Sequence, residues 1–140
     1  MKKKNSRKKD RFDLGNITTP IDEHFYRLEG HQPIRCTLAE YAQAMADELK
    51  RIVLRTNVDG IHISTVFTGI DRNFGKGPRL LFETVVFGLP DDLHPQWLHS
   101  TWDEATGHHM RLADAIREGG AVQLLEDIRK KTGQTTGSQG

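Results

Sequence analysis

Asp59-Gly60 constrains the fold more than any other feature, because this dipeptide stands between two runs rich in β-branched residues. Both central positions of a two-residue hairpin turn favour a positive φ, which Asp-Gly tolerates. VLRTNV and IHISTVFTGI are therefore predicted to form an antiparallel hairpin over residues 53–58 and 61–70. RLLFETVVF follows a glycine-bearing loop and predicts a third antiparallel strand over residues 79–87.

Two main helices are predicted, one on each side of these strands. Thr37 and Glu40 form a capping box in TLAE, and apolar residues follow at spacings of three and four, which predicts a helix over residues 38–52. STWDEA contains overlapping capping patterns and predicts the start of the second helix. Gly119-Gly120 is predicted to end that helix, and AVQLLEDIRKK to form a short final one.

The order of these elements indicates an α+β domain, since no regular alternation of strand and helix occurs. HFYRLEGHQPIRC adds two short strands around a turn, whereas an irregular connector is expected around Pro90 and Pro95. We expect a mostly antiparallel sheet of about five strands, made of two hairpins plus a third central strand. Two main helices and a short C-terminal helix are expected to pack on one face. The predicted boundaries are a flexible basic leader at 1–20, a single domain at 21–132 and a flexible tail at 133–140.

Charge divides the chain into a basic leader and a mildly acidic body. Residues 1–11 contain seven basic side chains against Asp10, a sum of +6, whereas the whole chain sums to +1. Such an arm is typical of segments that contact nucleic acid or an acidic partner, and the alternative is a solvated tail that only favours solubility. The basic candidates in the arm are Lys2, Lys3, Lys4, Arg7, Lys8, Lys9 and Arg11.

Composition narrows the class of protein. Hydrophobic residues make up 36% and charged residues 28%, which is typical of a soluble globular domain. No apolar run approaches the roughly 18 residues of a membrane span, and no apolar segment follows the basic N-terminus as in a secretory signal. Cys36 is the only cysteine, so no intramolecular disulfide can form. We therefore expect a cytoplasmic protein that does not associate with membranes.

The loop DRNFGKGPR, between the second and third predicted strands, is a candidate anion-binding element. Its glycines allow backbone N–H groups to approach an oxyanion, and Arg72, Lys76 and Arg79 supply positive charge. The loop matches neither G-x-x-x-x-G-K-[ST] nor G-x-G-x-x-G, and it leads into a strand rather than a helix. A hairpin connection of this length needs glycines in any case. Both interpretations, a structural loop and a contact with phosphate or nucleic acid, therefore stay open.

Glu83 is the most unusual acid, because it interrupts the apolar run LLFETVVF. An unpaired buried carboxylate would cost several kcal/mol, so Glu83 requires solvent, a partner such as an arginine or hydroxyl, or a site that raises its pKa. The register of the hairpin decides whether it lies opposite Val66 or on the side of Thr65 and Phe67.

Asp71, Glu83 and His109 are the candidate catalytic residues, with His62 as a further member if the hairpin and the second helix converge. His109 lies on the apolar stripe of that helix, where a lone histidine is more often a hydrogen-bonded core residue than a ligand. Histidines also cluster near it, and neutral imidazoles can bind zinc, but no H-E-x-x-H motif is present. The sequence predicts no confident metal site and no cofactor. The clustered histidines are His94, His99, His108 and His109.

Three segments, ISTVFTGIDRNFG, PRLLFETVVFG and STWDEATGHH, resemble a group of small uncharacterised proteins encoded by bacteriophages and prophages. The shared motifs are STVFxGxDxxFG, LFETxVFG and STWxEAxxxH, preceded by an element similar to FYRLEGHQPI. Together they cover residues 25–109. Arg72 stands where a histidine is usual in the group, and His99 replaces an aromatic residue. The resemblance implies a phage or prophage origin and a host-cytoplasm setting, and it implies no activity.

These observations favour a non-enzymatic phage-type accessory protein that binds a host protein or nucleic acid. A small metal-dependent enzyme or metal-binding protein is the alternative. A purely structural or self-associating role, with the chain forming a homo-oligomer, is the third expectation. The basic arm and the loop residues Arg72, Lys76 and Arg79 are the expected contacts with the partner.

Overall fold

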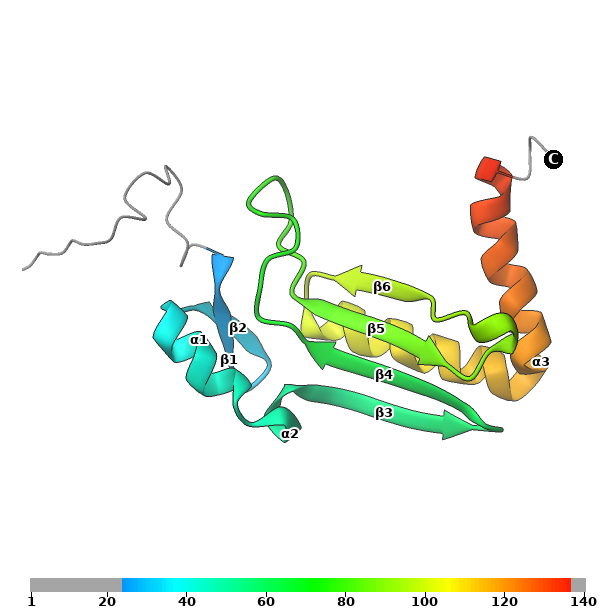
Figure 1. The fold of residues 1–140 in the computed structure, drawn as a ribbon, viewed down its shortest axis with the longest axis horizontal. Coiled ribbons are helices and arrows are strands. Elements are labelled where there is room, and N and C mark those ends of the chain that lie inside the picture. The colour runs from blue at the N-terminus through cyan, green and yellow to red at the C-terminus, as the bar shows by residue number, and fades with distance from the viewer. Residues whose placement is uncertain (1–23, 137–140) are drawn as a thin grey trace, which may run out of the picture.

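The computed structural model describes residues 24–136, and the side chains of residues 24–131. It is an α+β fold in which one antiparallel sheet carries a long helix on one face (Figure 1). The predicted basic leader at residues 1–20 lies outside the described residues.

The main sheet has four antiparallel strands that are neighbours in chain order. They are β3 (Ile52–Val58), β4 (Ile61–Phe67), β5 (Phe82–Phe87) and β6 (Gln96–His99). Asp59 and Gly60 have φ values of 50° and 83°, and Val58 pairs with Ile61, so the hairpin predicted from this dipeptide is confirmed. The third predicted strand is also present, but it begins at Phe82 because the chain from residue 71 to residue 81 forms the connecting loop.

The prediction of one sheet with about five strands is wrong in two respects. The first hairpin, β1 (Tyr26–Glu29) and β2 (Gln32–Arg35), forms a separate two-stranded sheet. It meets the main sheet through a bridge between Phe25 and Ile70, a hydrogen bond from the Tyr26 N–H to the Gly69 carbonyl, and packing of Tyr26 in one apolar cluster with Phe67 and Phe82. Strand β6 is absent from the prediction, because four residues directly after a proline are too few to show an alternating pattern.

The helix predicted over residues 38–52 is two short helices, α1 (Leu38–Met45) and α2 (Glu48–Arg51). The capping box is confirmed, since the Thr37 N–H donates to Glu40 Oε1 and the Glu40 N–H donates to Thr37 Oγ1. Asp47 interrupts the helix, because its side chain accepts the Leu49 N–H and so begins a new helical turn. Leu49 is 75% exposed, and no residue of α1 is buried. The expectation that all helices pack on one face of the sheet is therefore wrong: α1 lies beside β1 and β2 (Figure 1).

Helix α3 (Trp102–Thr136) covers the main sheet and then turns away from it (Figure 1). Gly120 has φ 79° and ψ 178°, which is not helical, so the predicted break at Gly119-Gly120 is confirmed. The segment beyond the break continues to Thr136, further than the short final helix expected from the sequence.

The core between α3 and the sheet consists of two apolar clusters with a row of polar side chains between them. On β4, Ile63 belongs to one cluster and Phe67 to the other, whereas Thr65 lies between them and is fully buried. On α3, His109 lies in the same way between Ala105 and Leu112. We call this row of hydrogen-bonded side chains, with its continuation to His108 on α3, the polar belt. Its members are Thr56, Thr65, Thr84, His99, His108 and His109.

Candidate functional site

The polar belt is a continuous chain of side-chain hydrogen bonds across all four strands. His109 Nε2 lies 2.8 Å from Thr56 Oγ1, and His109 Nδ1 lies 2.7 Å from Thr65 Oγ1. The hydroxyl of Thr65 lies 2.7 Å from that of Thr84, which in turn is 3.3 Å from His99 Nε2. His99 Nε2 is also 3.3 Å from the Nδ1 atom of the last member, His108. The belt therefore runs from strand β3 to the outer edge of the sheet.

His109 is neutral in this setting, because burial lowers its pKa. A neutral imidazole has one donor and one acceptor nitrogen, and a hydroxyl lies against each of them. Both ring nitrogens are thus occupied by the protein itself. The sequence-based interpretation of His109 as a hydrogen-bonded core residue agrees with this geometry.

At the outer end of the belt, His99 and His108 line an open cavity of about 470 Å³ together with Glu104 and Arg111. Burial lowers the pKa of His99, and burial together with the neighbouring His99 lowers the pKa of His108 to about 4. The Glu104 carboxylate accepts the Ser100 N–H, which caps the first turn of α3. In the described part of the chain, no group of three or more histidine, cysteine, aspartate or glutamate side chains is arranged to hold a metal ion.

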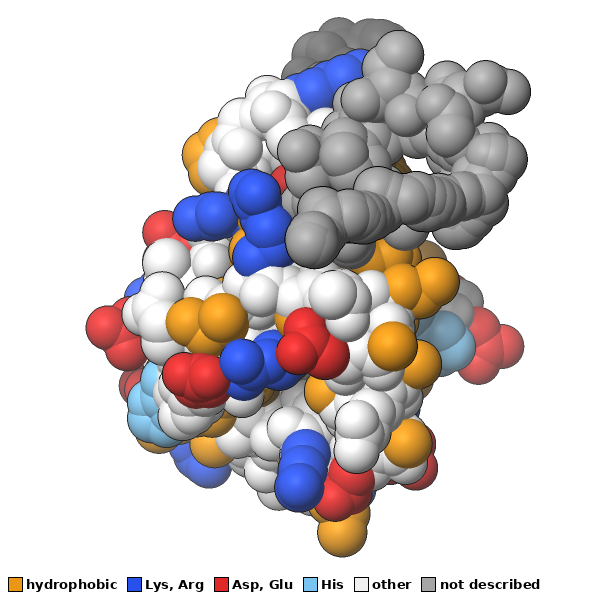
Figure 2. All heavy atoms as spheres, turned by 90° about the vertical axis from the view of Figure 1, so that its left-hand side faces the viewer, with side chains coloured by type: hydrophobic (Ala, Val, Ile, Leu, Met, Phe, Trp, Pro, Cys, Tyr) orange, Lys and Arg blue, Asp and Glu red, His pale blue; other side chains and the backbone are white. Residues whose placement is uncertain are grey.

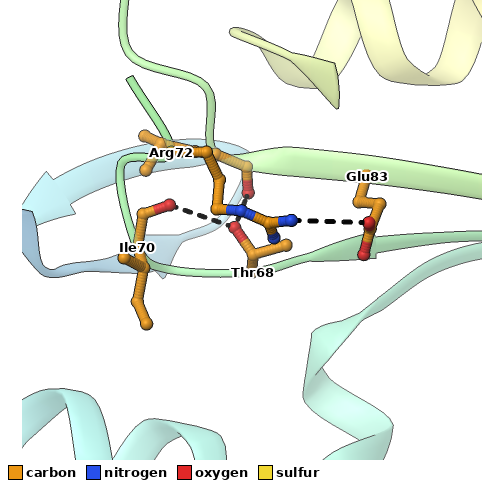
Figure 3. A network of polar contacts seen from close by, with 5 residues as sticks. Thr68, Ile70, Arg72 and Glu83 are labelled. Atoms are coloured by element: carbon orange, nitrogen blue, oxygen red, sulfur yellow. Dashed lines mark hydrogen bonds and ion pairs between the residues drawn. The ribbon is translucent and has the colours of Figure 1, made fainter. Parts of the chain in front are cut away.

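Glu83 lies on the face of the sheet opposite α3, where its neighbours across the strands are Val66 and Leu98. Its carboxylate Oε2 is 3.8 Å from Arg72 Nη2, and the two side chains point toward each other across the end of β4 (Figure 3). The Thr68 hydroxyl holds that end of the strand, 3.0 Å from the Leu81 carbonyl oxygen. An arginine in the loop is therefore the partner that the apolar run around Glu83 requires.

Asp71 is 2% exposed, and its carboxylate holds the loop together. It accepts backbone N–H groups from Asn73, Gly75 and Leu80 at 2.8, 3.0 and 3.2 Å. Burial alone would raise the pKa of Asp71, but the three N–H donors outweigh burial and hold the pKa below its ordinary value. The carboxylate is therefore charged at neutral pH and fully engaged by the loop.

The three catalytic candidates do not converge. Asp71 is enclosed by its loop, Glu83 lies on the open face of the sheet, and His109 lies under the opposite face, against α3. His62, the fourth candidate, donates from Nδ1 to Asn57 Oδ1 on the open face at 2.9 Å. Burial also raises the pKa of the Cys36 thiol, which makes it a poor nucleophile.

A groove lies at the end of the molecule that carries the β1–β2 hairpin and the loop between β4 and β5. It consists of two open cavities of about 690 Å³ and 480 Å³ that share the side chains of Arg79, Ser100 and Thr101. We call it the Arg79 groove. Figure 2 looks at this end of the molecule: basic side chains stand among mainly uncharged ones in its upper part, whereas acidic and basic side chains mix lower down.

Arg79 is the central cation of the groove. Its Nη1 atom donates to the Tyr26 hydroxyl at 3.2 Å, and the guanidinium lies 5.3 Å from the centre of the Tyr26 ring. No carboxylate in the described residues forms an ion pair with it. Most N–H groups of its guanidinium therefore remain available for an anion.

Aromatic rings and an unsatisfied histidine line the same groove. The Phe74 side chain is 60% exposed at the rim, and the His24 ring meets it edge-on with 5.7 Å between ring centres. His24 Nδ1 is buried and has no hydrogen-bond partner within residues 24–136. In the adjoining cavity the ring of His31 stacks flat on Trp102, with 3.7 Å between the ring centres.

The sequence predicted part of this site. Arg79 lines the groove, whereas Arg72 is paired with Glu83, and Lys76 is an exposed residue of the loop. Asp71, a catalytic candidate, also lines the groove, and Phe74 belongs to the loop proposed as an anion-binding element. The remaining groove side chains come from segments distant in sequence and were not singled out as site residues. Their only signal is that FYRLEGH, NFG and STW belong to the segments quoted for the phage resemblance. The basic candidates between Lys2 and Arg11 lie outside the described residues.

Comparisons with known proteins do not add to these observations. A scan against protein-family models, a search of curated proteins and a search of solved structures each found no match. Within residues 24–136, no helix combines the length and the apolar character that a membrane crossing needs.

Proposed function

We propose that this chain is a non-enzymatic accessory protein of the phage or prophage type that binds nucleic acid through the Arg79 groove. The observation that carries the proposal is Arg79 itself, an exposed cation that lines an open cavity and has no carboxylate partner among the described residues. Cations placed in this way attract phosphate, and phosphate contacts supply most of the affinity of non-specific nucleic-acid binding.

The charge around the groove supports the same partner. Arg79 lines the larger cavity, and Lys76 is an exposed residue of the loop whose residues Phe74 and Gly75 also line it. Asp71 is the acid of the larger cavity, but its oxygens already accept three N–H groups, which reduces the field it directs outward. In the sequence, the basic arm at residues 1–11 precedes His24, which lines the groove.

The arrangement of the polar residues also weighs against the metal-enzyme alternative. An acid or base in catalysis must reach the substrate, whereas His109 and Asp71 are both buried with their polar atoms occupied. Glu83 is accessible, but its neighbours across the strands are apolar and its partner is Arg72. A binding role can use Arg79, a groove cation that no carboxylate of the described residues pairs.

The proposal is tested by fluorescence anisotropy with labelled oligonucleotides at salt concentrations from about 50 to 200 mM. Arg79→Glu is expected to weaken binding about tenfold or more, since a hydrogen bond to a charged group contributes roughly 1.5–3 kcal/mol. The slope of affinity against salt should also fall by about one phosphate contact. Deletion of residues 1–11 is expected to flatten the same slope further.

Arg55→Glu is the matched control, because Arg55 is an exposed arginine on β3 that does not line the groove. It makes the same change in net charge. Equal losses in the two variants would show that only net charge matters and would refute the groove. Failure of the unaltered protein to bind any oligonucleotide would leave a host protein as the partner to seek.

A further inference from the structure

We infer that the Arg79 groove accepts single-stranded nucleic acid, with one base against the ring of Phe74 and the adjoining phosphate on Arg79. The inference deepens the proposed function and rests on it. It says which form of nucleic acid enters the groove and which side chain a base contacts there.

Phe74 has a backbone conformation that an aromatic residue rarely adopts. Its φ is 51°, in the left-handed region, and its side chain is 60% exposed to solvent. A bulky residue at positive φ is an outlier that persists only where the surrounding structure enforces it, and such outliers cluster at ligand sites. A large apolar ring is thus held outward in a strained position, although a smaller polar residue would fit the loop with less cost.

The loop around Phe74 is built to keep the ring in place. The Phe74 N–H donates to the Asp71 carbonyl at 3.1 Å, and the next N–H, that of Gly75, donates to the Asp71 carboxylate. His24 contacts the ring from the side. The ring is therefore preorganised, which lowers the entropy cost of stacking a ligand on it.

The other groups of the cavity suit a nucleotide. Arg79 can offer guanidinium N–H groups to a phosphate, and its hydrogen bond to the Tyr26 hydroxyl, with the Tyr26 ring 5.3 Å away, positions the guanidinium at the groove. The larger cavity of about 690 Å³ falls within the roughly 300–1,000 Å³ that small-ligand sites occupy.

The exposed ring of Phe74 distinguishes a single strand from a duplex. In a duplex the base faces are stacked on one another and hidden, so none of them can lie against this ring. An unpaired strand can turn one base outward onto an aromatic side chain, and such stacking is tolerant of sequence. Either form of nucleic acid could place a phosphate on Arg79, whereas only a single strand could stack a base on Phe74.

The test compares a labelled 12-nucleotide strand, as DNA and as RNA, with a duplex of the same sequence and with a nucleoside monophosphate as competitor. We expect the strand to bind at least tenfold more tightly than the duplex, and the monophosphate to compete only at far higher concentration. Phe74→Asn is expected to weaken binding of the strand about tenfold, because the stacking surface is lost. Asparagine tolerates positive φ, so this variant should fold as well as the unaltered protein.

Two further variants complete the test. Phe74→Tyr keeps the ring and is expected to bind the strand normally, and Phe87→Ala removes an exposed aromatic residue outside the groove and should have no effect. Equal binding of duplex and strand, or normal binding by Phe74→Asn, would overturn the inference. If Arg79→Glu still lost affinity in that case, the proposed function would stand without it. A monophosphate that binds as tightly as the strand would show that the occupant is a free nucleotide.

Discussion

The polar belt and the Arg79 groove both gather histidines and other polar side chains, but they differ in which groups are left unsatisfied. In the belt, both nitrogens of His109 and the hydroxyls beside them have partners inside the protein. In the groove, among the described residues, His24 Nδ1 has no partner and Arg79 bonds the Tyr26 hydroxyl alone. Buried polar groups are normally hydrogen-bonded, so a complete network indicates a structural role and an incomplete one at an open surface indicates a ligand.

Helix α3 joins the two regions. His109 belongs to the belt, whereas Trp102 at the start of the same helix stacks on His31 in the groove. A change in one region can therefore reach the other through a shift of the helix. The difference between them is tested only by variants whose stability and oligonucleotide affinity are both measured.

The largest effect on stability is expected from His109→Ala. It opens a cavity in the core and removes the imidazole partner of Thr56 and Thr65, so the free energy of unfolding should fall by about 3 kcal/mol. The protein that remains folded should bind oligonucleotides with nearly unchanged affinity. Urea denaturation and anisotropy, measured well below the transition, provide the two values.

Met110→Ala is the control for this variant, since Met110 is the next residue on α3 and is 52% exposed. Its effect on stability should stay within about 0.5 kcal/mol, as for most surface substitutions. A loss at His109 no greater than that at Met110 would mean that the belt does not stabilise the fold. The belt would then become the better candidate for a functional site.

Asp71→Asn is expected to lower both the stability of the protein and the affinity of the groove. An amide oxygen cannot replace both carboxylate oxygens as acceptors for the three loop N–H groups, so stability should fall by about 2 kcal/mol. The loop that positions Phe74 should also loosen, which would weaken binding of a single strand severalfold. Asp114→Asn, at an exposed position on α3, is the control for loss of a charge. A destabilised variant with normal affinity would separate Asp71 from the groove.

Short sequence signals correctly predicted the turns, caps and helix breaks that depend on neighbouring residues in the chain. The Asp59-Gly60 turn, the Thr37 capping box and the break at Gly120 depend on neighbouring residues in the chain rather than on distant contacts. Each of them is confirmed. The helix over residues 38–52 was predicted wrongly because the apolar spacing continues past Asp47, whose side chain caps a new turn. Spacing alone does not reveal that Leu49 faces solvent.

The candidate site depends on contacts that spacing cannot show. The sequence placed Arg79 in a basic loop and His109 in the core, and both placements agree with the structure. The groove forms only because Tyr26, Phe74 and Trp102, which lie far apart in the chain, come together at one end of the sheet. The sequence NFG likewise does not predict a positive φ at Phe74.

Acid is expected to weaken the belt before it affects the loop. Burial lowers the folded-state pKa values of His99, His108 and His109, that of His108 to about 4. The unfolded chain then binds more protons than the folded one below the ordinary histidine pKa near 6.5, so stability is complete above that pH and falls toward pH 4. With an allowance for the partial exposure of His99 and His108, the loss is about 1–2 kcal/mol.

Thermal unfolding measured from pH 7.5 to pH 4 gives the dependence of stability on pH. The pKa of Asp71 is also lowered, and its contribution is lost only at more acid pH, as the carboxylate itself is protonated. The two ranges are therefore separable. A stability that stays flat down to pH 4.5 would contradict the neutral, buried state of the belt histidines.

The smallest effect is expected at Glu83, the acid that stands out most in the sequence. The pair with Arg72 is 3.8 Å long and its arginine is more than a third exposed, so solvent screens it and it contributes less than about 1 kcal/mol. Glu83→Gln should therefore change stability little, and Glu83→Leu should be neutral or slightly stabilising beside Val66 and Leu98. Either variant removes a negative charge and frees Arg72, so affinity for oligonucleotides should rise slightly at low salt. A loss of more than about 2 kcal/mol in both variants would instead place Glu83 with the belt, as a polar group on whose partner the fold depends.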